Sequence, residues 1–402
     1  MPARAIRRVI DGKSGAASGY RTWALLLALL LLGACGAQAT PTPVPVPGAG
    51  TTATATAGRA GSAGAAPGSP AASPAASPAA RGAGATGGRL VIYSARKEEL
   101  MQPVVDAFQQ QTGIQVTLKS GSPGELALLI GQEKGNPQGD VFFTTDAAGI
   151  EGLRQQGLLE PYKSPNAEKV PAEFKAADGG WTGVIGRSRN IMYNTNLVKP
   201  EDAPKSIFEL TDPKWKDKVA IASIREGGVR LWLSWLVQEK GEDFTVKYIK
   251  DLQANGMKVL ANHTEVQKAV GRGEFALGLV NHYYYVFEQR AGSPVGLIYP
   301  DQGANDIGTL VTPLAVGIVK GAKNGDAAKR FVDFALSAEG QQPLTTQENE
   351  FPLVPGVGLG QANVPGVRPI DQIKRPTVDF TKLADVEKRV VEVFTPLLSG
   401  GQ

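Results

Sequence analysis

The chain has 402 residues, of which 42% are hydrophobic and 20% are charged, and its formal net charge is +4. These proportions are typical of a globular protein. The single cysteine, Cys35, excludes a framework of disulfides.

The first 34 residues have the pattern of an export signal. Basic residues precede an apolar run at 23–32, which is too short for a permanent membrane span because a spanning helix needs about 20 residues. This segment holds five Lys or Arg residues and one Asp, so it carries the whole net charge of +4. The remainder of the chain is close to neutral, which gives no support for nucleic-acid binding.

A lipidation motif is expected at the end of this signal. The sequence Leu-Gly-Ala-Cys at 32–35 resembles a bacterial lipobox, in which the cysteine is lipidated and becomes the new N-terminus. We therefore expect a lipid on Cys35; the alternative is a cysteine that follows the signal by chance. Arg7 and Arg8 leave twin-arginine export open beside the general secretory route.

The segment 35–88 is expected to be a disordered linker behind the lipidated cysteine. It is rich in Ala, Pro, Gly and Ser and repeats the motif SPAA at 69–80. Such a composition offers too few large apolar side chains to offset the entropy of ordering. The sequence thus predicts a globular domain tethered to the outer face of the cytoplasmic membrane.

The globular part begins at Arg89 and alternates apolar strands with amphipathic helices, which indicates βαβ units and a mainly parallel sheet. Strands are predicted at 90–93, 114–121, 140–145, 219–223, 256–261 and 275–281, with a strand and turn at 315–324, and helices are predicted at 98–111, 123–130, 229–238, 264–271 and 326–344. Its length favours two lobes.

Small and polar residues follow four of these strands, at 94–97, 144–146, 224–228 and 281–284. In open α/β sheets, ligands bind outside the carboxyl ends of the strands. We therefore expect these four clusters to face one cleft, as in a hinged binding protein.

Stretches throughout the globular part resemble a known family. They are VIYSARKEE at 91–99, TGIQVTLKSGSPGEL at 112–126, DVFFTTD at 140–146, GRSRNIMYNTNLV at 186–198, DPKWKDKV at 212–219, VNHYYY at 280–285, NDIGTLV at 305–311 and EFPLVPGV at 350–357. The chain resembles the periplasmic solute-binding component of an ABC importer, in particular the ferric-iron-binding branch. This implies an α/β, type II-like periplasmic-binding-protein fold with hinge strands. We place one lobe at 89–188 and 308–402 and the other at 189–307.

The resemblance implies an iron site at Tyr283 and Tyr284, because two consecutive tyrosines at these positions ligate Fe³⁺ in the family. Fe³⁺ is a hard ion that prefers anionic oxygen, and a bound cation removes the phenolic proton. Tyr285 is expected to turn back into packing.

The chain departs from the family pattern at other ligand positions. Lys97 and Thr145 stand where a histidine and a glutamate are usual, and the loop at 223–229 has no tyrosine. A carbonate or phosphate ion could complete the shell, held by Arg225 or Lys97 with the backbone N–H groups of 226–228. Asn281 could donate a hydrogen bond to it. Candidate metal or anion residues are therefore Asn281, Lys97, Asp146, Arg225, Glu226 and Gly227, with His282 as a further substitute ligand.

Several neighbouring residues have structural alternatives. Tyr93 is expected to pack at the end of the first strand rather than bind metal. His263 is expected to cap a helix or to hydrogen-bond at the cleft. Arg187 and Arg189 are expected to form structural salt bridges, with anion contact as the alternative.

The sequence predicts a binding protein and not an enzyme, because it contains no nucleophile elbow, zinc-protease, P-loop or Rossmann motif. We expect a monomeric lipoprotein that captures Fe³⁺, with carbonate or phosphate as a possible partner anion, and delivers it to an ABC permease and its ATPase. One alternative is the same fold binding a phosphonate, thiamine or a polyamine, with the tyrosines as pocket wall. Another is a sensor or partner-docking lipoprotein.

Overall fold

The computed structural model describes residues 88–358 and 364–400. Its strands are β1 (Arg89–Ser94), β2 (Gln115–Ser120), β3 (Val141–Thr144), β4 (Leu159–Glu160), β5 (Thr182–Asn194), β6 (Val219–Ala222), β7 (Lys258–Leu260), β8 (Leu277–Asn281), β9 (Val295–Ile298), β10 (Val311–Val319) and β11 (Phe351–Pro352). Its α-helices are α1 (Glu98–Thr112), α2 (Pro123–Gln132), α3 (Ala147–Gln155), α4 (Gly227–Lys240), α5 (Glu242–Ala254), α6 (His263–Gly271), α7 (His282–Arg290), α8 (Gly325–Ala335), α9 (Ala338–Thr346) and α10 (Phe380–Leu398).

The sheet is mixed rather than mainly parallel as expected. Its strands follow the order β2-β1-β3-β10-β5-β8-β6-β7. The strands β1, β2 and β3 are parallel, as are β6, β7 and β8, but the central strands β5 and β10 run antiparallel to their neighbours. The sequence analysis did not include β5, because its polar GRSRN segment interrupts the apolar pattern of a buried strand.

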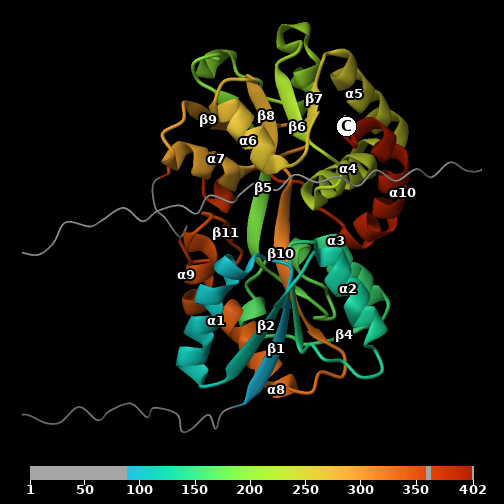
Figure 1. Ribbon diagram of the computed structural model, residues 1–402, viewed down its shortest axis with the longest axis vertical. Helices are drawn as coiled ribbons and strands as arrows, with labels where there is room; N and C mark the ends of the chain where they lie inside the picture. The colour runs from blue at the N-terminus through green and yellow to red at the C-terminus, as the bar shows by residue number, and fades with distance from the viewer. Residues whose placement is uncertain (1–87, 359–363, 401–402) are drawn as a thin grey trace, which may run out of the picture. The chain divides into compact units, whose positions relative to one another are not determined.

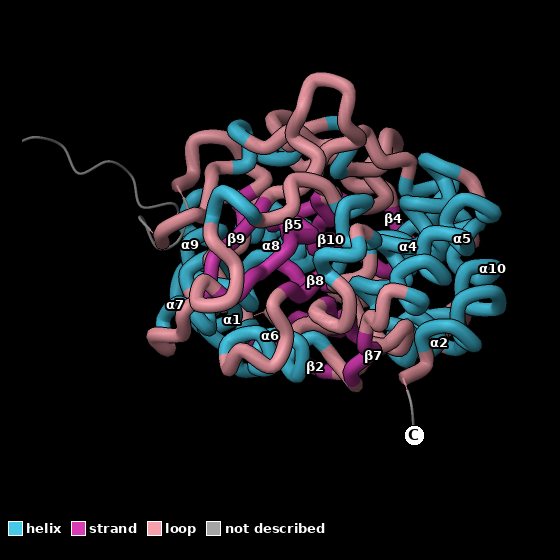
Figure 2. Tube along the Cα trace, turned by 90° about the horizontal axis from the view of Figure 1, so that it is seen from above, coloured by secondary structure: helices cyan, strands magenta, loops and turns pink. Residues whose placement is uncertain are grey.

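Strand β5 joins the two halves of the sheet. Its first part, Thr182–Ser188, pairs with β10, and its second part pairs with β8 and β9 from Arg189 onward. In Figure 1, β5 and β10 run side by side through the middle of the molecule. Figure 2 shows the strands enclosed between helices, with α4, α5 and α10 on one side and α1, α7 and α9 on the other.

Local sequence signals explain where several helices start and stop. Ser122 forms a capping box with Glu125 at the start of α2, and Gly113 ends α1 in the left-handed conformation at φ 72°. The single helix expected at 326–344 is instead two helices. Ser337 caps α9 by accepting a hydrogen bond from the Gly340 amide, and Gly340 approaches the Phe334 carbonyl too closely for a Cβ atom.

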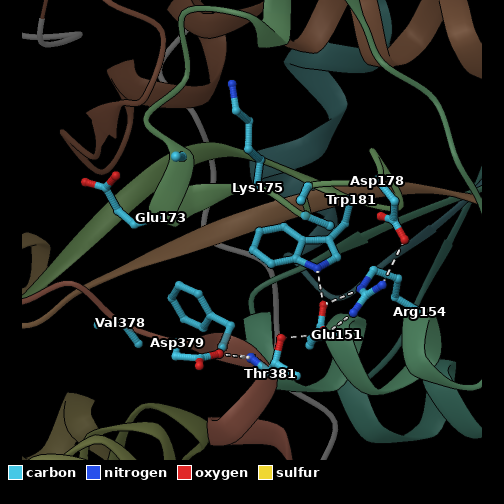
Figure 3. Close-up of a pocket in the computed structure, with 13 residues that line it drawn as sticks. Glu151, Arg154, Glu173, Lys175, Asp178, Trp181, Val378, Asp379 and Thr381 are labelled. Atoms are coloured by element: carbon cyan, nitrogen blue, oxygen red, sulfur yellow. Dashed lines mark hydrogen bonds and ion pairs between the residues drawn. The ribbon is translucent and has the colours of Figure 1, made fainter.

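Helix α10, which the sequence analysis did not predict, packs against α3, α4 and α5 and so touches helices that flank both halves of the sheet. Glu151 holds the first turn of α10 in place, beside a cavity of about 360 Å³ (Figure 3). The buried Glu151 carboxylate accepts hydrogen bonds from Arg154 (2.7 and 2.8 Å), from the indole N–H of Trp181 (2.7 Å) and from the Thr381 hydroxyl (3.1 Å).

The expected export signal, lipidated Cys35 and linker lie outside the described residues. Within 88–358 and 364–400, no helix combines the length and the apolar character needed to cross a membrane.

Replacing Glu151 by glutamine should lower the free energy of unfolding by about 2 kcal/mol, because a charge-assisted hydrogen bond to Arg154 is lost inside a buried cluster. Urea denaturation monitored by tryptophan fluorescence would measure the change. Glu392→Gln is the matched control: its exposed carboxylate lies 3.7 Å from Arg389, so we expect a change within about 0.5 kcal/mol. Equal stability of both variants would show that Glu151 does not fasten α10.

Candidate functional site

A cavity of about 600 Å³ collects residues from both halves of the sheet. It contains at least one residue from each of the four polar clusters that follow the strands, as expected. The lining residues are Ala95, Arg96, Lys97, Leu100, Thr145, Arg187, Glu226, Asn262, Thr264, Gln267, Tyr283, Tyr284, Phe287 and Glu348. The connections β1–α1, β3–α3, β6–α4 and β8–α7 therefore open toward a common space.

Tyr283 and Tyr284 lie together on the wall of this cavity. They belong to the first turn of α7, directly after β8, and their ring centroids are 4.3 Å apart. The side chains of Tyr284 and Asn281 lie near the Tyr283 hydroxyl and favour its ionised form, but less strongly than burial opposes it. Burial raises the pKa of both phenols, so both are neutral when nothing is bound. The third tyrosine, Tyr285, turns away and donates a hydrogen bond of 2.6 Å to the Pro365 carbonyl.

Arg187 belongs to a buried ion cluster behind the tyrosines. Glu350 accepts hydrogen bonds from Arg187 and from Arg96, and Glu348 lies 3.5 Å and 3.4 Å from the same two guanidinium groups. Although burial opposes ionisation, Arg187 and Arg96 hold the pKa of Glu350 below its ordinary value. The Arg187 guanidinium also lies over the Tyr283 ring, 5.0 Å from its centroid. The salt bridge expected for Arg187 is therefore present.

Arg189, two residues further along β5, has no such bridge among the described residues. It is only 4% exposed, and its Nε and Nη2 atoms have no hydrogen-bond partner there, while Nη1 lies 3.2 Å from Nε2 of His263. Burial lowers the pKa of Arg189 to about 10. The expectation of a structural salt bridge is wrong for Arg189, because the strand delivers it to the tyrosines and not to a carboxylate cluster.

Arg189 lies at the N-terminus of α4. A Cβ atom on Gly228 would lie 3.8 Å from Arg189 Nη1, 3.3 Å from His263 Nε2 and 3.8 Å from Asn281 Nδ2. The absence of a side chain at Gly228 thus lets nitrogen atoms of three residues approach the first turn of this helix. This arrangement favours a negative charge nearby.

Both histidines have structural partners. His282 accepts a hydrogen bond from the Ser188 amide at Nδ1 (3.2 Å), and its Nε2 donates to the Asn349 carbonyl (3.0 Å). Its two nitrogens are thus occupied, so the suggestion of His282 as a substitute ligand is wrong. His263 does not cap α6; the side chain of Asn262 does, by accepting from the Glu265 amide.

The other candidate residues divide into two groups. Lys97 and Glu226 line the cavity, as does Thr145, and burial raises the pKa of the half-buried Glu226. The remaining four, Asn281, Asp146, Arg225 and Gly227, are not among its lining residues: Asn281 ends β8, Asp146 caps α3 through the Gly149 amide, and Arg225 and Gly227 are exposed.

Sequence reasoning missed the ion cluster as part of the site. Arg96, Glu348 and Glu350 stand far apart in the chain and meet only in the folded protein. The stretches VIYSARKEE and EFPLVPGV contain Arg96 and Glu350, but neither indicates that the two side chains meet. Among the residues that the structure describes, no group of three or more His, Cys, Asp or Glu side chains is arranged to hold a metal ion.

Comparisons with known proteins support the expected fold and class. Residues 136–382 match a family of bacterial extracellular solute-binding proteins. The chain is 32% identical over 302 residues to the major ferric iron-binding protein of Neisseria meningitidis serogroup B, covering 74% of this chain and 89% of that protein. Iron-bound HitA from Pseudomonas aeruginosa is 27% identical with a TM-score of 0.69, over 77% of this chain and 99% of that one.

A more distant relative carries a different name. The putative 2-aminoethylphosphonate-binding periplasmic protein of Salmonella typhimurium is 25% identical over 238 residues, which cover 59% of this chain and 68% of that protein. Together the comparisons confirm the two-lobed α/β fold and a solute-binding protein rather than an enzyme.

The two arginines of β5 should respond in opposite directions to the same substitution. Arg189→Met should raise the free energy of unfolding of the ligand-free protein by about 1–3 kcal/mol, because it removes buried donors that lack partners. Arg187→Met should lower it by about 3–5 kcal/mol, because it leaves buried carboxylates with one cation fewer. Urea denaturation of both variants tests this. A loss of stability in Arg189→Met as large as that in Arg187→Met would mean that Arg189 is paired after all.

Proposed function

Because this chain belongs to the family of bacterial extracellular solute-binding proteins and resembles its ferric-iron-binding members, we propose that it captures Fe³⁺ outside the cytoplasm for import. The observation that carries this proposal is the pair of neutral phenols, Tyr283 and Tyr284, side by side on the wall of a cavity formed by both halves of the sheet. Two oxygen ligands from one helical turn can reach one small ion.

The chemistry of capture is ligand exchange. Fe³⁺ is a hard, highly charged ion that favours anionic oxygen, and its charge displaces the protons of both tyrosines. The Asn281 side chain lies near the Tyr283 hydroxyl, and a hydrogen bond from its amide would support the phenolate that forms. Arg189 supplies a fixed positive charge close to both rings, which favours their ionised forms.

Arg189 also calls for a negative group beside the bound ion. The resemblance implies carbonate or phosphate for this role. Of the cations near the site, Arg189 is better suited to hold such an anion than the two expected residues. Arg225 is exposed, and the Lys97 side chain is 77% exposed. A buried guanidinium without a partner binds an anion more strongly than a solvated ammonium group does.

Closure and delivery complete the proposal. We assign 89–188 with 308–402 to one lobe and 189–307 to the other, in keeping with the change of partners along β5 between Ser188 and Arg189. The lobes would close on the ion, and docking to an ABC permease with its ATPase would favour the open form. A lipid on Cys35 would keep the monomeric protein at the outer face of the membrane.

A second candidate is a phosphonate or phosphate ester. The unpaired Arg189 and the cavity of about 600 Å³ favour an organic anion, and one relative is named for 2-aminoethylphosphonate. The same buried cation disfavours thiamine and polyamines, which are positively charged. Calorimetric titration with 2-aminoethylphosphonate tests this candidate: tight binding together with no response to Fe³⁺ would replace the iron proposal.

Loss of either phenol should weaken iron binding. Tyr283→Phe and Tyr284→Phe should each lower Fe³⁺ affinity by at least about 100-fold, since loss of a group behind the ligands already costs roughly 10- to 100-fold. Each should also weaken the visible charge-transfer band of tyrosinate bound to Fe³⁺, because only one phenolate ligand remains. Tyr285→Phe is the control and should keep the band, because its hydroxyl is bonded to Pro365. Near-normal affinity in both ligand variants would overturn the tyrosinate assignment.

Iron binding should release about two protons, one from each tyrosine, because both pKa values are raised and both groups hold their protons near pH 7. Affinity should therefore rise with pH, by about 100-fold per unit. Titrations in buffers of different ionisation enthalpy measure the release, with Tyr283→Phe expected to release one proton fewer. A release that is the same in wild type and variant would contradict phenolate coordination.

A further inference from the structure

The tyrosine pair supplies two negative charges, which leaves one charge of Fe³⁺ uncompensated. Carboxylates are the other anionic oxygens that the cavity offers, and its described lining residues include two, Glu226 and Glu348. Glu348 already faces two cations, Arg96 at 3.4 Å and Arg187 at 3.5 Å, although its Oε2 atom makes no hydrogen bond among the described residues. Glu226 is therefore the carboxylate to consider.

The Glu226 carboxylate makes no structural hydrogen bond or ion pair within the described residues. Glu226 occupies the N-cap position of α4, but its side chain makes no capping hydrogen bond. The N-cap residues Asp146 and Asn262, at the starts of α3 and α6, do make one. The adjacent Arg225 is exposed, and Arg230, one helical turn further on, pairs with Glu387 at 2.9 Å.

The surroundings of Glu226 place it beside the other parts of the site. It is half-buried, it lines the same cavity as the tyrosines, and it lies close enough to Arg189 and Tyr284 for their charges to interact. Arg189 in turn is buried and has two nitrogen atoms without partners. A carboxylate and two phenols thus share the cavity wall, and the cation of Arg189 lies close to all three.

We propose that Glu226 is the third anionic oxygen ligand of the bound Fe³⁺ and that it replaces the added anion which the resemblance implies. This inference rests on the proposed iron-binding function. Two phenolates and one carboxylate balance the three charges of the ion, so capture needs no carbonate or phosphate. The built-in ligand also accounts for a site that lacks the usual histidine and glutamate at Lys97 and Thr145.

The test is an iron titration of the metal-stripped full chain in buffer free of bicarbonate and phosphate, with ferrous chloride oxidised by air as the source of Fe³⁺. Wild type should develop the tyrosinate charge-transfer band without any added anion. Glu226→Gln should bind at least about 100-fold more weakly. Added bicarbonate or phosphate should restore much of its binding, because an external anion then fills the vacated position. Glu265→Gln, which removes an exposed carboxylate on α6, should behave as wild type.

The possible results distinguish the role of Glu226 from the proposed iron-binding function. A wild type that becomes coloured only with added anion, or a Glu226→Gln variant that titrates as wild type does without anion, overturns the role of Glu226 and leaves the iron assignment standing. A wild type that stays colourless under every condition removes both. Circular dichroism of Glu226→Gln should match wild type, since the carboxylate makes no bond within the described residues.

Discussion

A buried positive charge needs a negative partner, and the site is organised around two buried arginines. One of them has such a partner within the fold and the other does not. Arg187 and Arg189 lie on the same face of β5, two residues apart. Arg187 shares Glu348 and Glu350 with Arg96, so its charge is neutralised within the fold. Arg189 is more deeply buried but has no salt-bridge partner within the described residues, and its pKa is lowered by burial. A buried charge without a partner lowers the stability of the ligand-free protein, and a bound negative group would offset that loss.

The neutral cluster holds the tyrosines in place for that bound group. Arg187 lies against the Tyr283 ring, and His282 ties the start of α7 to the Ser188 amide and the Asn349 carbonyl. The two phenols are therefore oriented by contacts on several sides before any ion arrives. Preorganisation of this kind lowers the entropy lost on binding. The same contacts connect the site to β5, the strand whose partners change between the two halves of the sheet.

Sequence patterns predicted much of the framework because they depend on near neighbours. The apolar run of β3 and the helices after Lys97 and Ser122 follow from local periodicity. They did not predict the break between α8 and α9, where the approach of Gly340 to Phe334 depends on packing. They also missed the antiparallel course of β5 and β10, because pairing between distant strands leaves no local signal.

The sequence by itself determined the class of the protein, the polar character of the strand ends and the candidate pair Tyr283 and Tyr284. Tertiary structure decided which charged residues belong to the site. From the sequence Arg187 and Arg189 are alike, and Arg225, Asp146 and Glu226 are equal candidates. Only folding brings Glu350 to Arg187 and leaves Arg189 without a carboxylate in a salt bridge. It also exposes Arg225 to solvent and places Glu226 on the same cavity wall as the tyrosines. The reason is physical: the energy of a charge depends on its burial and on partners far away in the chain. The residues next to it in the sequence reveal neither of these.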